Sequence, residues 1–503
     1  MTELPELIAT TEVTDWSDEV DVVVVGFGIS GACAALEAAR AGARVVLLER
    51  AAEYGGTSAM AGGHFYLGGG TAVQQATGVE DSAEEMFKYL MAVSEDPEEE
   101  KIRAFCEDSV EHFDWIESLG MRFERSLYEE KAVIQPGTEG LMYTGNEKVH
   151  PFRDLATPAP RGHKVPKPGD TGGARIVLDA LAQRIAETGI EVRCETGATN
   201  LVVQVGPEGD GTVAGLAWRR YDERGVIRAR AVVIAAGGYV GNDEMVREHT
   251  PQLGSKLFPL ASTYDDGTGI RLGASAGTQL RFMDRAFVTA PFYPPARLLT
   301  GIVVNKLGER FVAEDSYHSR TSGFVLDQPD QAAYLIVDSV HIEHPDFPLC
   351  PFIDGWETVE EMEVGLGIPE GALARTLATY NRHAAAKEDP QLHKHPDWLE
   401  PQDTGPWGAY DLTLGKAMYA GFTLGGMRVT LDGEARRADG SVIPGLYAVG
   451  ACAVNIAQDG KGYASGTQLA EGSYFGRRAG RHAAASSRQP SKSCGPVESG
   501  PVE

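Results

Sequence analysis

The chain has 503 residues, 43% of them hydrophobic, so it is long enough for more than one domain and for sizeable buried cores. Its formal net charge of −27 argues against nucleic acid as a partner, because a polyanion would be repelled. Arg40 is the first basic residue and no apolar run reaches the length that spans a bilayer, so the sequence predicts neither a secretory signal nor a transmembrane segment.

A strand, a glycine turn, an alanine-rich helix and a second strand are predicted near the start of the chain. Gly26, Gly28 and Gly31 follow the apolar residues 22–25, and the second strand ends at Glu49. The first glycine permits a tight turn, the second lets a pyrophosphate approach the backbone, and the third lets the helix pack on the strand. A carboxylate at Glu49 can accept hydrogen bonds from ribose hydroxyls. This unit predicts a dinucleotide site; the alternative interpretation of Glu49 is a solvated acid at a strand end.

A second loop of small residues follows closely and favours FAD over NAD. The sequence YGGTSAMAGG contains Thr57, Ser58, Gly62 and Gly63. A bulky ring system can lie across backbone only where the side chains are small. A plain flexible linker is the other interpretation of this loop.

The rest of the chain alternates helical patterns with irregular stretches. Helices are expected from Ser82, over 96–120, over 173–189 and over 369–386. Residues 122–175 are rich in Pro, Gly and charge, and we expect long loops there that cover a ligand. Short strands are expected around 191–234, ending in a buried strand before the Gly-Gly turn, and strand signals return after residue 419.

These signals predict an α/β fold with two parts. A Rossmann-like FAD-binding domain is expected to form from both ends of the chain, residues 1–280 and 419–485, with an inserted α+β catalytic (cap) domain at 281–418. Residues 486–503 are rich in Ser, Pro and Gly and are expected to be disordered. The six cysteines show no spacing typical of a metal or redox site, so we expect no bound metal and a cytoplasmic protein.

The motifs beyond Glu49 resemble those of the FAD-dependent fumarate reductase and 3-ketosteroid dehydrogenase superfamily over residues 20–485. GGTS with Gly62 and Gly63 resembles its flavin loop, and ETGATNLV resembles the segment that meets the adenine. VVIAAGGY and DDGTGIRLGASAG resemble its next turn and helix start, with Asp265 in place of a glycine. GLYAVG and GTQLAEGSYFG resemble its C-terminal flavin segment, with Ala451 where many relatives have Glu.

The resemblance implies FAD held without a covalent bond. The residues that it implies for cofactor binding are Gly26, Gly28, Ser30, Gly31, Glu49, Arg50, Thr57, Ser58, Gly62, Gly63, Ala198, Gly237, Asp266, Gly450, Gln468 and Leu469.

Fumarate reduction is not expected, despite the resemblance. In GERFVAEDSYHSR, His318 stands where the fumarate reductases carry a proton-donating Arg, and GFTLGGMRV lacks their substrate-binding His. A dicarboxylate site needs several cations, and both expected residues are replaced. No C-x-x-C-H motif for attached haem occurs either.

The segment Tyr-x-Ser-Gly at 463–466 resembles the 3-ketosteroid Δ4-(5α)-dehydrogenases. The resemblance implies Tyr317, Tyr463 and Ser465 as catalytic residues, with Tyr463 and the backbone N–H of Gly466 binding the substrate ketone. Desaturation beside a ketone needs a donor to the developing enolate, a base for the α proton and a flavin that accepts the β hydride. These residue types supply the first two, and the sequence therefore predicts dehydrogenation of 5α-3-ketosteroids between carbons 4 and 5.

Three alternatives stay open. The chain could be a 3-ketosteroid Δ1-dehydrogenase, although that group resembles Tyr-x-Gly-Pro-Gly and lacks the serine. It could be another flavin oxidoreductase of the superfamily acting on a hydrophobic ketone, or a flavoprotein that binds without catalysis. His318 is interpreted as a proton relay or a structural neighbour, and His163 and Tyr66 as packing residues in preference to pocket residues. The electron acceptor and oligomeric state are left open.

Overall fold

The strand that carries the first glycine turn, β2 (Asp18–Val25), lies inside the largest sheet of the computed structural model, which describes residues 3–205 and 211–487. β2 pairs in parallel with β3 (Val45–Leu48) on one side and with β10 (Glu223–Ile234) on the other. Its valines are buried on both faces, which explains the continuous apolar run in the sequence.

The last strand of the sheet comes from the far end of the chain. β21 (Val442–Ala448) pairs in parallel with the second half of β10, while the first half of β10 pairs with β9. In the described part of the chain the sheet has nine strands, in the order β1-β8-β9-β10-β2-β3-β7, with β21 paired to β10 and β20 paired to β21. The remaining strands are β1 (Ile8–Ala9), β7 (Glu191–Arg193), β8 (Gly197–Val205), β9 (Gly211–Arg220) and β20 (Glu434–Arg436).

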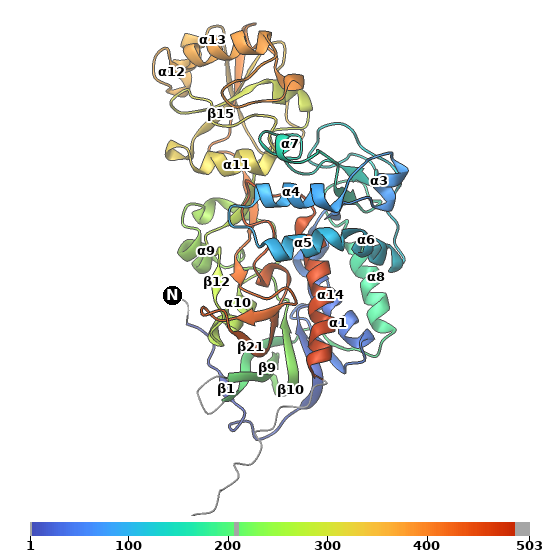
Figure 1. Ribbon diagram of the computed structural model, residues 1–503. Helices are drawn as coiled ribbons and strands as arrows, with labels where there is room; N and C mark the ends of the chain where they lie inside the picture. Colours follow the sequence, from blue (N-terminus) through green and yellow to red (C-terminus); the bar gives the residue numbers. More distant parts are fainter. Residues whose placement is uncertain (1–2, 206–210, 488–503) are drawn as a thin grey trace, which may run out of the picture.

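Helices from both ends of the chain pack together on this sheet. The first helix, α1 (Ile29–Arg40), lies beside the last, α14 (Thr467–Ser487), as the blue and red helices of Figure 1 show. A further helix from the same half, α8 (Arg175–Ala186), packs against α1. Short helices of this half are α2 (Gly56–Met60), α9 (Asp243–His249) and α10 (Thr268–Ser275).

A layer of helices and a small sheet covers the upper part of this half. The helices are α3 (Ala72–Ala76), α4 (Ala83–Val93), α5 (Glu99–Glu107), α6 (Ser109–Ser118) and α7 (Phe152–Leu155). The sheet, in the order β4-β6-β5, consists of β4 (His64–Tyr66), β6 (Gly162–Lys164) and β5 (Leu141–Met142). Between these elements residues 122–175 run largely as loops, and some of them reach the cavity described below.

The single helix expected over 96–120 is in fact two. The backbone breaks at Asp108, whose φ of −88° and ψ of 1° lie outside the helical range. The Asp108 carboxylate accepts a hydrogen bond from the Tyr474 hydroxyl of α14 at 2.5 Å. A tertiary contact therefore accompanies the break, and a helical pattern of apolar residues cannot reveal such a contact.

Residues between β13 and β18 form a separate sheet with its own helices, at the top of Figure 1. The strand order is β14-β15-β17-β16, with β14 (Ile302–Asn305), β15 (Ala333–Asp338), β17 (Trp407–Asp411) and β16 (Phe352–Trp356). The helices are α11 (His318–Leu326), α12 (Val359–Leu366) and α13 (Ala372–Ala385). The sequence showed only α13 clearly, because α11 and α12 are short.

Short strands connect this part with the half that contains the nine-stranded sheet. One sheet joins β11 (Leu257–Pro259), β18 (Tyr419–Thr423) and β13 (Ala286–Thr289), and another joins β12 (Leu280–Arg281) to β19 (Gly426–Met427). These strands lie on both sides of residues 280 and 418, so the domain bounds placed there stay a prediction.

The predicted fold class, a Rossmann-like α/β domain with an inserted α+β part, is confirmed. Helix α14 continues to Ser487, so the first two residues of the predicted tail at 486–503 are helical and the others lie outside the described residues. Among the described residues, no helix combines the length and the apolar character needed to cross a membrane. The cysteines in that part of the chain are free thiols, and Cys494 lies outside it.

Candidate active site

A cavity of about 1090 Å³ extends from the glycine turn after β2 to the start of α14 and to the inserted part. It is lined by all but one of the residues that the sequence assigned to the cofactor. These are Gly26, Gly28, Ser30, Glu49, Arg50, Thr57, Ser58, Gly62, Gly63, Ala198, Gly237, Asp266, Gly450, Gln468 and Leu469. The residue that does not line it is Gly31.

The glycine turn explains why Gly31 is still required. A Cβ at Gly31 would lie 1.9 Å from the carbonyl oxygen of Gly26, so only glycine lets α1 pack on the turn. Gly26 has a φ of +105°, which disfavours other residues. Gly28 faces the cavity, where its Cβ would first meet the Ser58 hydroxyl at 3.2 Å. The three glycines thus serve a turn, an approach surface and a helix contact.

Glu49 is held in one orientation at the end of β3. Its Oε2 accepts a hydrogen bond from the Phe27 N–H at 2.8 Å, and its Oε1 accepts one from the Ala51 N–H at 2.8 Å. The residue is only 7% exposed and lines the cavity. It is therefore a fixed buried acceptor and not a solvated strand-end acid.

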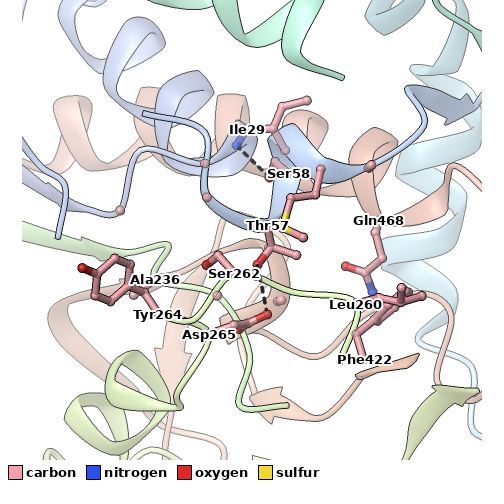
Figure 2. Close-up of a pocket in the computed structure, with 18 of the residues that line it drawn as sticks. Ile29, Thr57, Ser58, Ala236, Leu260, Ser262, Tyr264, Asp265, Phe422 and Gln468 are labelled. Carbon is pink, nitrogen blue, oxygen red and sulfur yellow. Dashed lines mark hydrogen bonds between the residues drawn. The ribbon is translucent and has the colours of Figure 1, made fainter. Parts of the chain in front are cut away.

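The small-residue loop is tied to both sides of the cavity, as Figure 2 shows. The Ser58 hydroxyl accepts a hydrogen bond from the Ile29 N–H at 3.1 Å, at the first residue of α1. The Thr57 hydroxyl donates to Asp265 at 3.2 Å and accepts from the Ser262 N–H at 3.0 Å. The loop is a structured wall of the cavity, which argues against a plain linker.

Asp265 and Asp266 are neighbours in opposite environments. Burial raises the pKa of Asp265 to about 6, and its Oδ1 has no partner among the described residues. Asp266 pairs with Arg50 at 2.6 Å and accepts from the Thr268 N–H at 3.1 Å. Despite its partial burial, hydrogen bonds from Thr268 and Arg50 keep the pKa of Asp266 below its usual range. Asp266 thus anchors Arg50 and the start of α10 beside the cavity.

The turn before α14 is held by the loop that follows β5 and by strand β4. The Ser465 N–H donates to the Thr144 carbonyl at 2.8 Å, and the Thr144 hydroxyl donates to the Ser465 carbonyl at 2.9 Å. Gly466 has a φ of +98°, and its carbonyl accepts from the Tyr66 N–H at 3.1 Å. These hydrogen bonds hold the backbone of Ser465 and Gly466 in a fixed position beside the cavity.

Gln468 offers a hydrogen-bond donor that the protein leaves unused. Its side chain extends from α14 into the pocket in Figure 2, and its Nε2 is buried without a partner among the described residues. The start of a helix also favours negative charge. This end of the cavity therefore fits a polar ring edge that gains negative charge.

The three candidate catalytic hydroxyl groups lie together at this turn. Tyr463 and Ser465 line the cavity, whereas Tyr317 is buried behind Ser465 and its hydroxyl is hydrogen-bonded to Ser465 Oγ. Burial raises the pKa of Tyr317 and of Tyr463, so both phenols keep their protons at neutral pH. Tyr463 is thus a neutral hydrogen-bond donor at the cavity wall. The hydroxyl groups of Ser465 and Tyr317 form a hydrogen-bonded pair that leads away from the cavity.

An aromatic wall beside Tyr463 was not foreseen from the sequence. Phe287 of β13 and Phe422 of β18 are direct partners in the strand register, with stacked rings 4.8 Å apart. The Phe287 ring lies 4.7 Å from the Tyr463 ring. In the sequence, only Phe422 hinted at this wall, because it stands where dicarboxylate enzymes carry His. The pairing of β18 with β13, more than a hundred residues earlier, cannot be predicted from a local pattern.

His318 also faces the cavity, beside Tyr317. Its Nδ1 is hydrogen-bonded with the Thr289 hydroxyl, and its Nε2 is buried without a partner among the described residues. Burial lowers the pKa of His318 to about 3, so the ring is neutral. His163 and Tyr66 are buried outside the cavity, where His163 bonds Thr71 at 2.7 Å and Tyr66 bonds Glu147 at 3.0 Å.

The residues present fit FAD. A helix start behind a glycine turn suits a pyrophosphate, the buried Glu49 carboxylate suits a ribose, and the unpartnered Gln468 amide beside a helix start suits the polar edge of a flavin. The cavity continues from these residues to the aromatic wall of Phe287 and Phe422.

Comparison with known proteins agrees with this fit. The FAD binding domain family matches residues 21–466. The chain is 39% identical to the 3-ketosteroid-Δ4-(5α)-dehydrogenase of Rhodococcus jostii, whose crystal structure with 4-androstene-3,17-dione superposes with a TM-score of 0.89 and covers 95% of this chain and 99% of that one. It is 27% identical to the 3-oxo-5-alpha-steroid 4-dehydrogenase of Comamonas testosteroni, over 88% of this chain and 94% of that protein.

A third relative has a different activity. The vinyl phenol reductase of Lactiplantibacillus plantarum is 26% identical, over 94% of this chain and 98% of that protein. Since the family match spans most of the chain, the chain is a member of the FAD-dependent fumarate reductase and 3-ketosteroid dehydrogenase superfamily, and it is an FAD-binding oxidoreductase.

Proposed function

We propose that the protein dehydrogenates 5α-3-ketosteroids, introducing a double bond between carbons 4 and 5. The observation that carries the proposal is the hydrogen bond between Tyr317 and Ser465, next to Tyr463 on the cavity wall. The similarity to two enzymes named for this reaction supports it.

The Tyr463 hydroxyl donates a hydrogen bond to the 3-keto oxygen, with the Gly466 N–H as a second donor. These two donors stabilise the enolate that develops as the proton leaves carbon 4. Ser465 takes that proton while its own hydroxyl proton passes to Tyr317, and the neutral Tyr317 phenol in turn releases its proton towards solvent. The relay is needed because a serine hydroxyl is too weak a base to act alone. When bound without a covalent link, FAD supplies the acceptor for the hydride that leaves carbon 5.

The charges around the cavity favour a neutral substrate over a dicarboxylate. Among the described lining residues, the arginines are Arg50, Arg219 and Arg271, and each is engaged with protein oxygen atoms near the adenine segments. The wall at Tyr463 is made instead of Phe287, Phe422 and neutral polar groups. Such a wall suits a fused apolar ring system with a single ketone, and offers no cation to a carboxylate.

Ser465 is the feature that favours proton abstraction from carbon 4 over abstraction from carbon 2, the α carbon that a Δ1 enzyme uses. A Δ1 enzyme abstracts a proton from the other side of the ketone, where this serine would have no role. We therefore place the abstracted proton on the side of Ser465 and Tyr317.

The test is an anaerobic titration of the purified holoprotein. A saturated 5α-3-ketosteroid such as 5α-androstane-3,17-dione should bleach the flavin absorbance, and mass spectrometry with NMR should identify a 4-ene product. Succinate should leave the flavin oxidised. Bleaching by succinate alone, or a 1-ene product, would overturn the proposal.

A further inference from the structure

A buried carboxylate lies one helical turn beyond the candidate flavin contact on α14. Glu471 follows Gln468 by three residues, which places both on the same face of the helix, about 4.5 Å apart along its axis. Gln468 faces the cavity, whereas Glu471 lies deeper and is 2% exposed. The site described above uses Gln468 as a candidate flavin contact and leaves Glu471 without a role.

The carboxylate is only half satisfied. Its Oε2 accepts a hydrogen bond from the Ile456 N–H at 2.7 Å, and its Oε1 is buried without a partner among the described residues. It borders a small void of about 10 Å³, which is about the room that one water molecule needs. Gly450 lines both this void and the large cavity, so one backbone segment separates Glu471 from the candidate cofactor site.

Few charges face this carboxylate. Lys101 of α5 attracts it, but the lysine Nζ is itself bonded to the Val454 carbonyl. Glu98, at the start of α5, lies 4.0 Å from Lys101 and 3.6 Å from Arg281, and it opposes the charge of Glu471. On the cavity side, the charge of Glu471 acts on Tyr463. Burial is the largest influence and raises the pKa of Glu471 to about 7, despite Lys101.

We infer that Glu471 is a proton acceptor coupled to the cofactor: it is partly ionised while the flavin is oxidised and takes up a proton from water when the flavin is reduced. The inference rests on the FAD site of the proposed function, but not on the steroid. Reduction adds negative charge near the start of α14, and a like charge nearby favours the neutral carboxylic acid. The two electrons still come from the reductant, and one proton moves from solvent to Glu471 Oε1.

This coupling makes flavin reduction more dependent on pH than the flavin alone would be. Above the pH at which Glu471 ionises, its charge opposes reduction and lowers the midpoint potential. Below that pH the residue is neutral and has no effect. The midpoint potential of the wild-type protein should therefore fall more steeply with pH just above pH 7 than the flavin alone would cause. In that range, reduction by two electrons takes up one additional proton.

The experiment measures the midpoint potential of the bound flavin from about pH 6 to pH 9 by anaerobic spectroelectrochemistry, without steroid. Glu471→Gln is neutral at every pH and retains an acceptor for the Ile456 N–H. Its potential should equal that of the wild type at low pH and exceed it increasingly above neutral pH. Proton uptake on reduction, followed with an indicator dye, should be smaller in Glu471→Gln than in the wild type.

Two further variants separate this effect from general electrostatics. Glu98→Gln removes a more exposed carboxylate beside the same lysine, and should keep the wild-type slope. Lys101→Met removes the attraction that keeps Glu471 charged, so the steep range should move to higher pH. If Glu471→Gln fails to hold flavin, the results for Glu98→Gln and Lys101→Met still test whether Glu471 takes up the proton.

Equal pH dependence in the wild type and Glu471→Gln would overturn the inference, as would an effect of Glu98→Gln of the same size. Failure of the wild-type protein to retain FAD at all would instead contradict the proposed cofactor, so the two failures are distinguishable.

Discussion

At the scale of single residues, the candidate site brings together three hydroxyl groups, and burial keeps the two phenols among them neutral. Tyr463 faces the cavity, Ser465 lies two residues further on, and Tyr317 reaches Ser465 from the inserted part of the chain. The Tyr-x-Ser-Gly motif drew attention to two of these residues from the sequence alone. Their contact with Tyr317 could not be derived from spacing, since 148 residues separate it from Ser465.

Removing any of the three hydroxyl groups should slow reduction of the flavin. Tyr463→Phe, Ser465→Ala and Tyr317→Phe are each expected to lose at least about 10²-fold in rate, because each removes an enolate donor or interrupts the proton path. Stopped-flow absorbance with a 5α-3-ketosteroid gives the rate, and the flavin spectrum shows that FAD remains bound.

Tyr410→Phe is the matched control for these variants. It removes a phenol hydroxyl that donates to the Glu343 carbonyl at 2.6 Å, outside the cavity lining. It should reduce flavin at the wild-type rate. A rate for Ser465→Ala within a few-fold of wild type would show that another group takes the proton.

Asp265 and Asp266 should affect stability in opposite directions as pH changes. The raised pKa of Asp265 means that the folded protein binds more protons than the unfolded chain between about pH 4 and pH 6, so this residue costs stability as pH rises through that range. Asp265→Asn should therefore raise the free energy of unfolding of the cofactor-free protein by about 2–3 kcal/mol at pH 7 and by little at pH 4. Urea denaturation at both pH values measures this.

Asp266→Asn is the comparison. The lowered pKa of Asp266 stabilises the fold above the pKa of the unfolded chain, and that contribution is lost as pH falls. Asp266→Asn should thus be less stable than wild type at pH 7. If both variants changed stability in the same direction, the contrast between the two environments would be wrong.

At the scale of elements, local sequence patterns were sufficient to predict a helix or strand wherever its main contacts are with residues close in sequence. The strand, glycine turn, helix and strand from Asp18 to Leu48 form as predicted, because their apolar periodicity and glycine spacing are local properties. The pairing of β13 with β18, which creates the aromatic wall, depends on two short strands far apart in the chain. Likewise, the break between α5 and α6 accompanies a bond to α14.

The contact between α1 and α14 gives a prediction at this scale. A Cβ at Gly476 would lie 2.4 Å from the Ser30 carbonyl oxygen, so Gly476→Ala must push the two helices apart. Overpacking of this kind costs about 1–3 kcal/mol, which should outweigh the gain of about 1 kcal/mol in helix propensity. We expect a net loss in the free energy of unfolding, measured by chemical denaturation, together with weaker FAD binding.

Ala485→Gly reports the propensity contribution alone, since Ala485 is exposed on the same helix. It should lose about 1 kcal/mol without changing FAD affinity. A Gly476→Ala variant more stable than wild type would contradict the close helix contact.

At the scale of the whole molecule, the cavity is built from segments that span the chain from Pro5 to Leu469. A ligand that occupies it therefore stabilises the fold as a unit. Acid precipitation should release FAD into the supernatant, because we propose no covalent bond, and chromatography identifies it. The apoprotein should unfold at a lower temperature, and FAD at 100 times its Kd should restore about 2.7 kcal/mol. FAD that stayed with the precipitated protein would contradict this prediction.

The pairing of β21 with β10, and of α14 with α1, has a consequence for biosynthesis. The ribosome makes β10 and α1 well before their partners β21 and α14. Until then the nascent chain carries an unfinished sheet edge and a bare helix face, which makes it a client for chaperones and a target for proteases. Cofactor insertion must therefore follow translation of β21 and α14, so a premature stop anywhere before residue 442 yields a product that lacks both elements.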